Sequence, residues 1–230
     1  MKVAFIDLYN QRASRHKDPL TTPLGLREQG HEVDLVSCDA TVQQEISIAG
    51  LPVTPASHFS RGAWGQAGFD AVVALSRFAH PLTPMLNEIK SAGLPLIVKG
   101  DTDGTLGYPL KPNYLRMTPV LASPGNILRQ LKWRLPSRHW VGQKLAHVAL
   151  ADRVIVESPG AAANLQQVLL YWGLTSDMNK VRFIPNQVSQ VALDIPVRSH
   201  RDKSVLAIGR WDDALCKGAD LLTGSIMDLF

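Results

Sequence analysis

The sequence predicts an α/β protein whose core is a doubly wound parallel sheet. Short runs rich in valine, isoleucine, leucine and alanine recur along the chain, and several of them are continuous instead of alternating with polar residues. A continuous apolar run is typical of a strand covered on both faces, as the strands of parallel sheets are. Segments with helix signals separate these runs, and such strand–helix alternation favours a parallel sheet with helices packed on it.

Each predicted strand is a short apolar run bounded by turn residues or charges. We expect strands at Val3–Leu8, Glu32–Ser37, Ala71–Leu75, Leu96–Lys99, Arg153–Glu157, Val181–Ile184 and Val205–Ile208. Prolines and glycines interrupt the segment 46–69. For that segment we therefore expect a short edge strand near Leu51–Val53 and a loop.

Cap residues mark the predicted helices. Leu20–Gln29 and Pro81–Ala92 are each followed by a glycine, the residue that most often ends a helix in the left-handed conformation. Pro159–Trp172 has Ser158 before it as a helix cap and a proline at its first position, where the missing N–H costs nothing. Ser137–Ala151 is the remaining predicted helix.

The composition is that of an ordinary globular protein. Of 230 residues, 45% are apolar and 19% are charged, and the formal net charge is +4. These values exclude collagen-like, low-complexity and wholly disordered chains. The two cysteines, Cys38 and Cys216, have no CxxC spacing, which favours a reducing compartment. No signal peptide and no run of about 20 apolar residues is visible, so we expect a cytoplasmic protein.

The loop after the first predicted strand reads Tyr9-Asn10-Gln11-Arg12 and lacks the Gly-x-Gly-x-x-Gly turn. The glycines of that turn let the backbone approach a pyrophosphate, so their absence argues against a dinucleotide cofactor. The polar and basic side chains of this loop suit an anionic ligand or a sugar, and a solvated loop is an equal alternative. We take Asn10, Gln11 and Arg12 as candidate ligand-binding residues.

A second candidate loop follows the strand that ends near Lys99. The strand runs directly into Gly100-Asp101-Thr102-Asp103-Gly104. The carboxyl ends of parallel strands face the ligand crevice of an open sheet. Asp101 and Asp103 could accept hydrogen bonds from sugar hydroxyls or stabilise a positively charged transition state, and we take them as catalytic candidates. The alternative is a turn that uses aspartate and glycine for backbone reasons.

Other well-known sites find no support in the sequence. The seven histidines are scattered, and none has a cysteine, aspartate or glutamate at metal-ligand spacing, so we expect no metal site. The Gly-x-Ser-x-Gly turn of serine hydrolases and the Gly-x-x-x-x-Gly-Lys-Ser/Thr phosphate loop are both absent.

Residues 111–153 form a basic segment, with eight basic residues against one acid and a local charge of +7. Trp133 and Trp140 lie within it. Such a segment suits the headgroups of an anionic membrane surface, which would make the protein peripheral to the membrane, or a phosphorylated substrate. A solvated face whose tryptophans pack inward is the alternative. No nucleic-acid-binding module is recognisable, so we expect no nucleic acid partner.

Near the end of the chain, the predicted strand Val205–Ile208 is followed by Gly209-Arg210, and a helix opens at Lys217-Gly218. The glycine permits close approach of a ligand to the backbone. Arg210 and Lys217, on the two sides of the same turn, could converge on a diphosphate beside a helix N-terminus. A turn with two incidental cations is the alternative.

The chain resembles retaining glycosyltransferases of the GT-B fold, the sucrose-synthase and mannosyltransferase-like group. The resemblance rests on four motifs that occur in the same order as in that family. Leu24–Val36 resembles the family's first helix and the "GHEV" start of its second strand, and Ala151–Ser158 resembles "AD-x-V-x-x-x-S". Val181–Val188 resembles "V-x-x-I-P-N-G-V", with Gln187 where glycine is usual, and Gly209 to Gly218 resembles "GR…KG". Together the motifs span nearly the whole chain.

The resemblance implies two facing Rossmann-like domains. Residues 1–200 would form the acceptor-side domain, and residues 201–230 would begin the domain that binds the nucleotide-sugar. A hexose would pass from this donor substrate to an acceptor with retention, without a cofactor or metal. By the same resemblance Arg210 and Lys217 would neutralise the leaving diphosphate. Asp101 stands near a position where the family often has histidine, which makes it the candidate for catalytic support.

The sequence departs from the family in ways that bear on function. The first loop lacks the usual glycine pair, and the Glu-x7-Glu motif that grips the donor is absent because the chain stops before it. We therefore expect the N-terminal portion of a longer enzyme, or half of a split enzyme whose donor domain is a separate chain, with little transfer by this chain alone.

A non-catalytic Rossmann-like binding or partner module is the alternative. The missing glycine fingerprint disfavours a nucleotide-dependent oxidoreductase.

Overall fold

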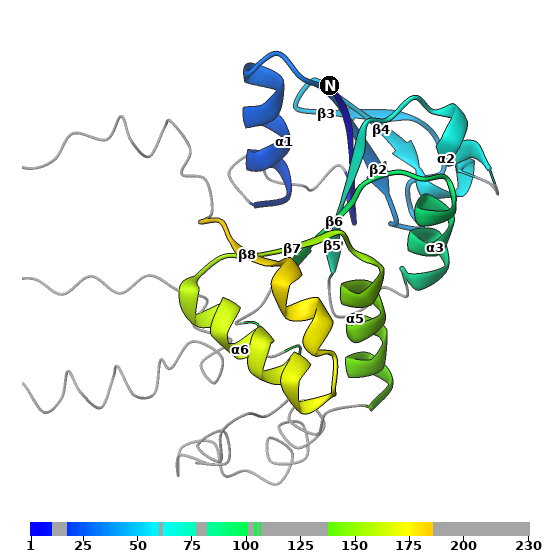
Figure 1. Cartoon of the computed structure of the whole chain (residues 1–230). Coiled ribbons are helices and arrows are strands. Elements are labelled where there is room, and N and C mark those ends of the chain that lie inside the picture. Colours follow the sequence, from blue (N-terminus) through cyan, green and yellow to red (C-terminus); the bar gives the residue numbers. More distant parts are fainter. Residues whose placement is uncertain are drawn as a thin grey trace, which may run out of the picture.

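The chain is built around an eight-stranded sheet with the strand order β3-β4-β2-β1-β5-β6-β7-β8 (Figure 1). This computed structural model describes residues 1–10, 18–59, 62–76, 82–100, 104, 106 and 138–185. Every pair of neighbouring strands is parallel except β3 and β4, which are antiparallel. The predicted Rossmann-like α/β fold with a doubly wound parallel sheet is thus confirmed. The predicted second unit at residues 201–230 lies outside the described residues.

Every described strand except β3 matches a predicted apolar run to within one or two residues at each end. Their bounds are β1 Lys2–Asp7, β2 Glu32–Ser37, β3 Ile46–Ile48, β4 Leu51–Pro55, β5 Ala71–Ser76, β6 Leu96–Gly100, β7 Arg153–Val156 and β8 Val181–Phe183. The predicted strand Val205–Ile208 lies outside the described residues.

The prediction that Leu51–Val53 is an edge strand is wrong, because β3 pairs with β4 and lies outside it. Two residues, Ala49 and Gly50, connect these strands, and both have positive φ values of 54° and 78°. Positive φ at both central residues is the geometry of a type I′ hairpin turn. The sequence pattern missed the hairpin because alanine at the first turn position is not a usual signal for it.

The predicted helices are present, with short additional ones. The bounds are α1 Asp18–Glu28, α2 Ala63–Gln66, α3 Thr83–Ser91, α5 Arg138–Leu150 and α6 Pro159–Tyr171, with 3₁₀ turns η1 Ala56–His58 and η4 Thr175–Lys180. Ser158 caps α6 as predicted, because its side chain accepts a hydrogen bond of 3.0 Å from the N–H of Ala161. Among the described residues, no helix combines the length and apolar character needed to cross a bilayer.

Helices cover both faces of the sheet. In β1, Val3 and Phe5 belong to an apolar cluster that includes Leu20 of α1. Ala4 and Ile6 point the other way, into a larger cluster formed with residues of α2, α3, α5 and α6. Figure 1 shows α1 on one side of the sheet and α3 and α5 on the other. Burial on both faces explains why the strands read as continuous apolar runs.

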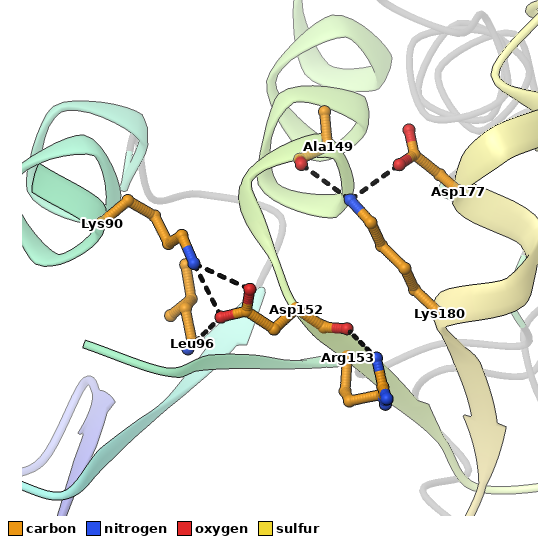
Figure 2. A network of polar contacts seen from close by, with 7 residues as sticks. All are labelled: Lys90, Leu96, Ala149, Asp152, Arg153, Asp177 and Lys180. Atoms are coloured by element: carbon orange, nitrogen blue, oxygen red, sulfur yellow. Dashed lines mark hydrogen bonds and ion pairs between the residues drawn. The ribbon is translucent and has the colours of Figure 1, made fainter. Parts of the chain in front are cut away.

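One carboxylate ties three elements together where β6 and β7 begin (Figure 2). Asp152 accepts hydrogen bonds of 2.8 and 2.7 Å from the Lys90 ammonium of α3, and one of 2.7 Å from the Leu96 N–H at the start of β6. Beside it, Lys180 pairs with Asp177 at 2.7 Å and donates to the carbonyl of Ala149 at 2.9 Å. These contacts fasten α3, α5 and η4 to the amino end of the sheet.

The electrostatics of Asp152 follow from these partners. Burial alone would raise the pKa of its carboxyl group. The hydrogen bonds from Leu96 and Lys90 and the positive charges of Lys90 and Lys180 outweigh burial, so the pKa lies below its ordinary value. The carboxylate therefore stays charged, and accepts these bonds, throughout the neutral pH range.

Replacing Asp152 with alanine should lower the free energy of unfolding by about 1–2 kcal/mol, because the Leu96 N–H and the Lys90 ammonium both lose their partner. Urea denaturation measures the change. Asn87→Ala on the exposed side of α3 is the matched control and should leave the stability unchanged. Equal stability of Asp152→Ala and the parent protein would contradict a structural role for this carboxylate.

Candidate functional site

Polar side chains gather where the parallel strands end. Because β1, β2, β5, β6 and β7 run in one direction, their carboxyl ends meet at one edge of the sheet. Open α/β sheets bind ligands at this edge. The described polar residues at or just beyond these strand ends include Asn10, Ser37, Asp39, Ser76, Lys99 and Glu157, besides the buried Asp7 at the end of β1. They form three groups: a groove beyond β1 and β2, an ion pair at β6 and β7, and a buried pair under β5.

A groove of about 700 Å³ opens beyond β1 and β2. Asn10 donates a hydrogen bond of 2.7 Å from its amide to one Asp39 carboxylate oxygen. The other oxygen accepts bonds of 2.9 Å from the Thr41 N–H and 2.7 Å from the Thr41 hydroxyl. The lining residues are Asn10, Asp39, Thr41, Val42, Gln43, Gln44 and Ile46. The groove is thus mostly polar, with one charged side chain among these residues.

Buried hydrogen bonds hold the two loops of this groove together. The Ser37 hydroxyl donates to the Tyr9 carbonyl at 2.6 Å and accepts a bond of 3.1 Å from the Asp39 N–H. The Tyr9 ring is fully buried, and its hydroxyl donates to the Pro19 carbonyl at 3.0 Å. Buried polar groups with satisfied hydrogen bonds fix a local geometry. These hydrogen bonds therefore fix the positions of the backbone that carries Asn10 and Asp39.

The second group is an ion pair at the ends of β6 and β7. The Lys99 ammonium lies 3.4 Å from a Glu157 carboxylate oxygen, and Lys99 is buried. A buried lysine needs such a partner because removing its charge from water is costly. Lys99 directly precedes Gly100, where the acidic loop begins, and Glu157 directly precedes Ser158, the cap of α6.

The third group lies beneath the carboxyl end of β5. The Ser76 hydroxyl and His147 Nδ1 of α5 share a hydrogen bond of 2.9 Å, and His147 is only 1% exposed. His147 Nε2 is buried and has no hydrogen-bond partner within the described part of the chain. Burial, and then the charge of Lys144 one turn earlier on α5, lowers the pKa of His147 from 6.5 to about 4. The imidazole is therefore neutral at physiological pH.

Two glycines on either side of the acidic loop are described. Gly100 ends β6, and Gly104 has φ +83° and lies directly against α6, where a Cβ would overlap the carbonyl oxygen of Ala161. Only glycine fits at position 104, for both its backbone angle and its space. Both glycines line a small cavity of about 10 Å³ together with Ser76 and Lys144. Asp101 and Asp103 themselves lie outside the described residues.

The structure places only part of the predicted site. Asn10 lies in the groove, where it contacts Asp39. Gln11, Arg12, Arg210 and Lys217, like the two acidic-loop aspartates, lie outside the described residues, as does most of the basic segment 111–153. Within that segment Lys144 is 3% exposed and belongs to the interior, whereas Arg153 is exposed.

Sequence reasoning missed Asp39, the Lys99–Glu157 pair and the Ser76–His147 pair. Asp39 follows a strand end by two residues, so the rule that singled out Asp101 would also have found it. The two pairs join residues 58 and 71 positions apart, and no local pattern signals such contacts. No group of three or more potential metal ligands occurs among the described residues.

Comparisons with known proteins give likenesses to solved structures alone. No family model matches the sequence, and no curated protein matches it. Among solved structures, the crystal structure of LpCGTa in complex with UDP aligns with a TM-score of 0.44 at 13% sequence identity. The alignment covers 84% of this chain and 55% of that chain, so the present chain spans little more than half of its length.

Acid should destabilise the protein through His147. Since the folded-state pKa is depressed, the unfolded chain binds the proton first, so stability falls as the pH drops from about 6.5 towards 4. A gap of this size corresponds to about 3 kcal/mol in total. His147→Gln should lose this part of the pH dependence and keep a hydrogen-bonding group beside Ser76. Urea denaturation across this pH range measures the effect, and identical pH profiles for both proteins would contradict it.

Proposed function

We propose that the chain is the acceptor-side part of a retaining glycosyltransferase, which transfers a hexose from a nucleotide-sugar to an acceptor. The observation that carries the proposal is the position of the family-like motifs in the fold. The "GHEV" motif at Gly30–Val33 starts β2, the Ala151–Ser158 motif covers β7 and the cap of α6, and Val181–Pro185 covers β8. The Ala151–Ser158 and Val181–Pro185 motifs run to the carboxyl edge of the sheet, whereas the "GHEV" motif lies at the amino end of β2.

The proposed mechanism divides the work between the two sides of a cleft. Arg210 and Lys217 neutralise the negative charge that develops on the leaving diphosphate, so no metal is required. Asp101 and Asp103 stabilise the positive charge that develops on the transferred sugar. Asn10, Gln11 and Arg12 hold the acceptor. The acceptor hydroxyl attacks on the face from which the diphosphate leaves, which gives retention, and its proton passes to the departing diphosphate.

Two features of the described residues are consistent with a catalytic role for the acidic loop. Lys99 is already paired with Glu157, so its charge is compensated next to the acidic loop. Gly104 packs against the first turn of α6, which places the end of that loop beside the carboxyl end of β7. The acidic loop therefore begins and ends at the centre of the ligand-binding edge, where a sugar held in the cleft would lie.

A second function is favoured by the groove itself. Its described lining residues come from the loop after β1, the loop between β2 and β3, and β3 itself, so none of them belongs to the expected donor domain. A non-catalytic Rossmann-like binding or partner module needs no more than such a groove. A split enzyme is the intermediate case, in which a separate donor-domain chain restores transfer.

The test is sugar transfer by the protein, alone and mixed with separate donor-domain chains. Nucleotide-sugars are supplied with a panel of acceptors, nucleoside diphosphate release is measured, and the anomeric configuration of the product is read by proton NMR. Arg210→Ala and Lys217→Ala should each lower kcat about 10²- to 10³-fold, because a charge that stabilises the transition state is lost.

Arg182→Ala is the matched control, because this exposed arginine on β8 bonds only to nearby carbonyls of Val181 and Asn179 among the described residues. It should keep full activity. An inverted product would contradict the retaining mechanism. Absence of transfer, with or without added donor-domain chains, would contradict the enzyme and favour the binding module.

A further inference from the structure

We propose that residues 219–230 of this chain dock, as an acidic amphipathic helix, on the sheet face of β6, β7 and β8 that lies opposite α3, α5 and α6. The segment lies outside the described residues, whereas the face that would receive it is described. Docking requires no part of the proposed transfer reaction. It is supported by the topology of the sheet, by the side chains of this face and by the charges along the chain.

The topology leaves this face without a described helix. The helices α3, α5 and α6 follow β5, β6 and β7 in turn, and all three pack into the apolar cluster that includes Val98, Val154 and Val181. Leu20 of α1 lies in the cluster on the other face, whose described buried members include none from β6, β7 or β8. Parallel strands in α/β proteins are covered on both faces. A further helix is therefore expected over β6, β7 and β8.

Three isoleucines form an apolar stripe across this face. Residues that pair in register on neighbouring strands share a face, and here Ile97 pairs with Arg153 and Ile155 pairs with Arg182. Ile184 lies two residues after Arg182 and so continues the same face. Ile97 and Ile155 are half-buried, and Ile184 is 50% exposed. The stripe thus runs diagonally over β6 and β7 and ends at the carboxyl edge beside β8.

Two exposed arginines, Arg153 and Arg182, lie along one side of the stripe. Their described contacts are hydrogen bonds to backbone carbonyls. Arg153 donates to the carbonyl of Asp152 at 2.8 Å, and Arg182 donates to those of Asn179 at 2.6 Å and Val181 at 2.8 Å. Within the described part of the chain, neither guanidinium contacts a carboxylate. An apolar stripe beside two such cations is complementary to a helix that carries acids next to its own apolar stripe.

The charges along the chain select the segment. Two long stretches lie outside the described residues, 107–137 and 186–230. Residues 107–137 have five basic residues and no acid, so Arg153 and Arg182 would repel them. Residues 186–218 have five basic residues and four acids. Residues 219–230 have two acids, Asp220 and Asp228, and no basic residue.

Residues 219–230 also have the apolar spacing of a helix that packs on one side. Leu222, Ile226 and Leu229 follow the pattern i, i+4, i+7, which places them on one helix face. Asp220 and Asp228 lie outside that stripe. The chain leaves β8 beside Ile184, and the 33 residues from 186 to 218 are a long enough connection to bring the segment back over the sheet.

Hydrogen–deuterium exchange of the protein tests this docking through the amides of residues 219–230. We expect them to exchange at least tenfold more slowly than an unfolded peptide, because docking protects helical hydrogen bonds. Arg153→Glu together with Arg182→Glu should speed their exchange several-fold, since attraction becomes repulsion. Adding Asp220→Lys and Asp228→Lys to this protein should restore the protection. A charge exchange of this kind reports contact between the two sets of residues.

Variants within the segment leave the described sheet untouched. Ile226→Asp places a carboxylate in the apolar stripe and should speed exchange of residues 219–230 at least tenfold. Met227→Asp is the matched control, because it adds the same charge one residue later and outside the stripe. It should leave the protection unchanged. Arg182→Ala removes one of two charges, and since a single surface ion pair stabilises little, the segment stays docked in this variant.

Protection of residues 219–230 that persists after reversal of both arginine charges would overturn the proposal, because the segment would then pack elsewhere. Absence of protection in the parent protein would also overturn it. Protection that disappears on dilution would assign the face to a second copy of the chain, and protection that requires vesicles of anionic lipid would assign it to a membrane. Failure of the proposed function is distinguishable, because absent transfer with the charge exchange intact removes the transferase and keeps the docking.

Discussion

The rest of the structure depends on the common direction of the central strands. Because β1, β2, β5, β6 and β7 are parallel, every loop that follows one of them lies at one edge of the sheet and every loop that precedes one lies at the other. The two edges differ in chemistry. At the amino edge, Asp152 joins the backbone of β6 to a side chain of α3. At the carboxyl edge, the polar groups line a groove and flank an acidic loop.

The carboxyl edge holds several buried polar side chains, in contrast to the apolar interior of the sheet. Ser37, Ser76, Lys99 and His147 are all buried, and each has a hydrogen-bond or ion-pair partner on another element. Such pairs contribute little net stability compared with an apolar core, but they fix orientation. The edge is thus rigid beneath the loops that would meet a ligand, which is the arrangement that precise positioning requires.

Much of the fold could be predicted from the sequence, because local patterns encode it. Continuous apolar runs located most strands, and Ser158 and the helix-ending glycines located helix ends. The β3–β4 hairpin was not predicted, because Ala49 has a positive φ, which alanine rarely adopts. Of the site, Asn10 was found from its place after a strand. Asp39 was overlooked, and the Lys99–Glu157 and Ser76–His147 pairs could not be found, because only the tertiary fold brings their members together.

The central claim, that ligands bind at the carboxyl edge, is tested most directly by hydrogen–deuterium exchange of the full-length protein with a nucleotide-sugar and glucose present. Protection is expected in peptides that cover residues 8–12, 38–44 and 99–106, the segments that follow β1, β2 and β6. Peptides that cover residues 28–32, 67–71 and 150–153, which precede strands, should exchange as before. Protection confined to this second set would contradict the account.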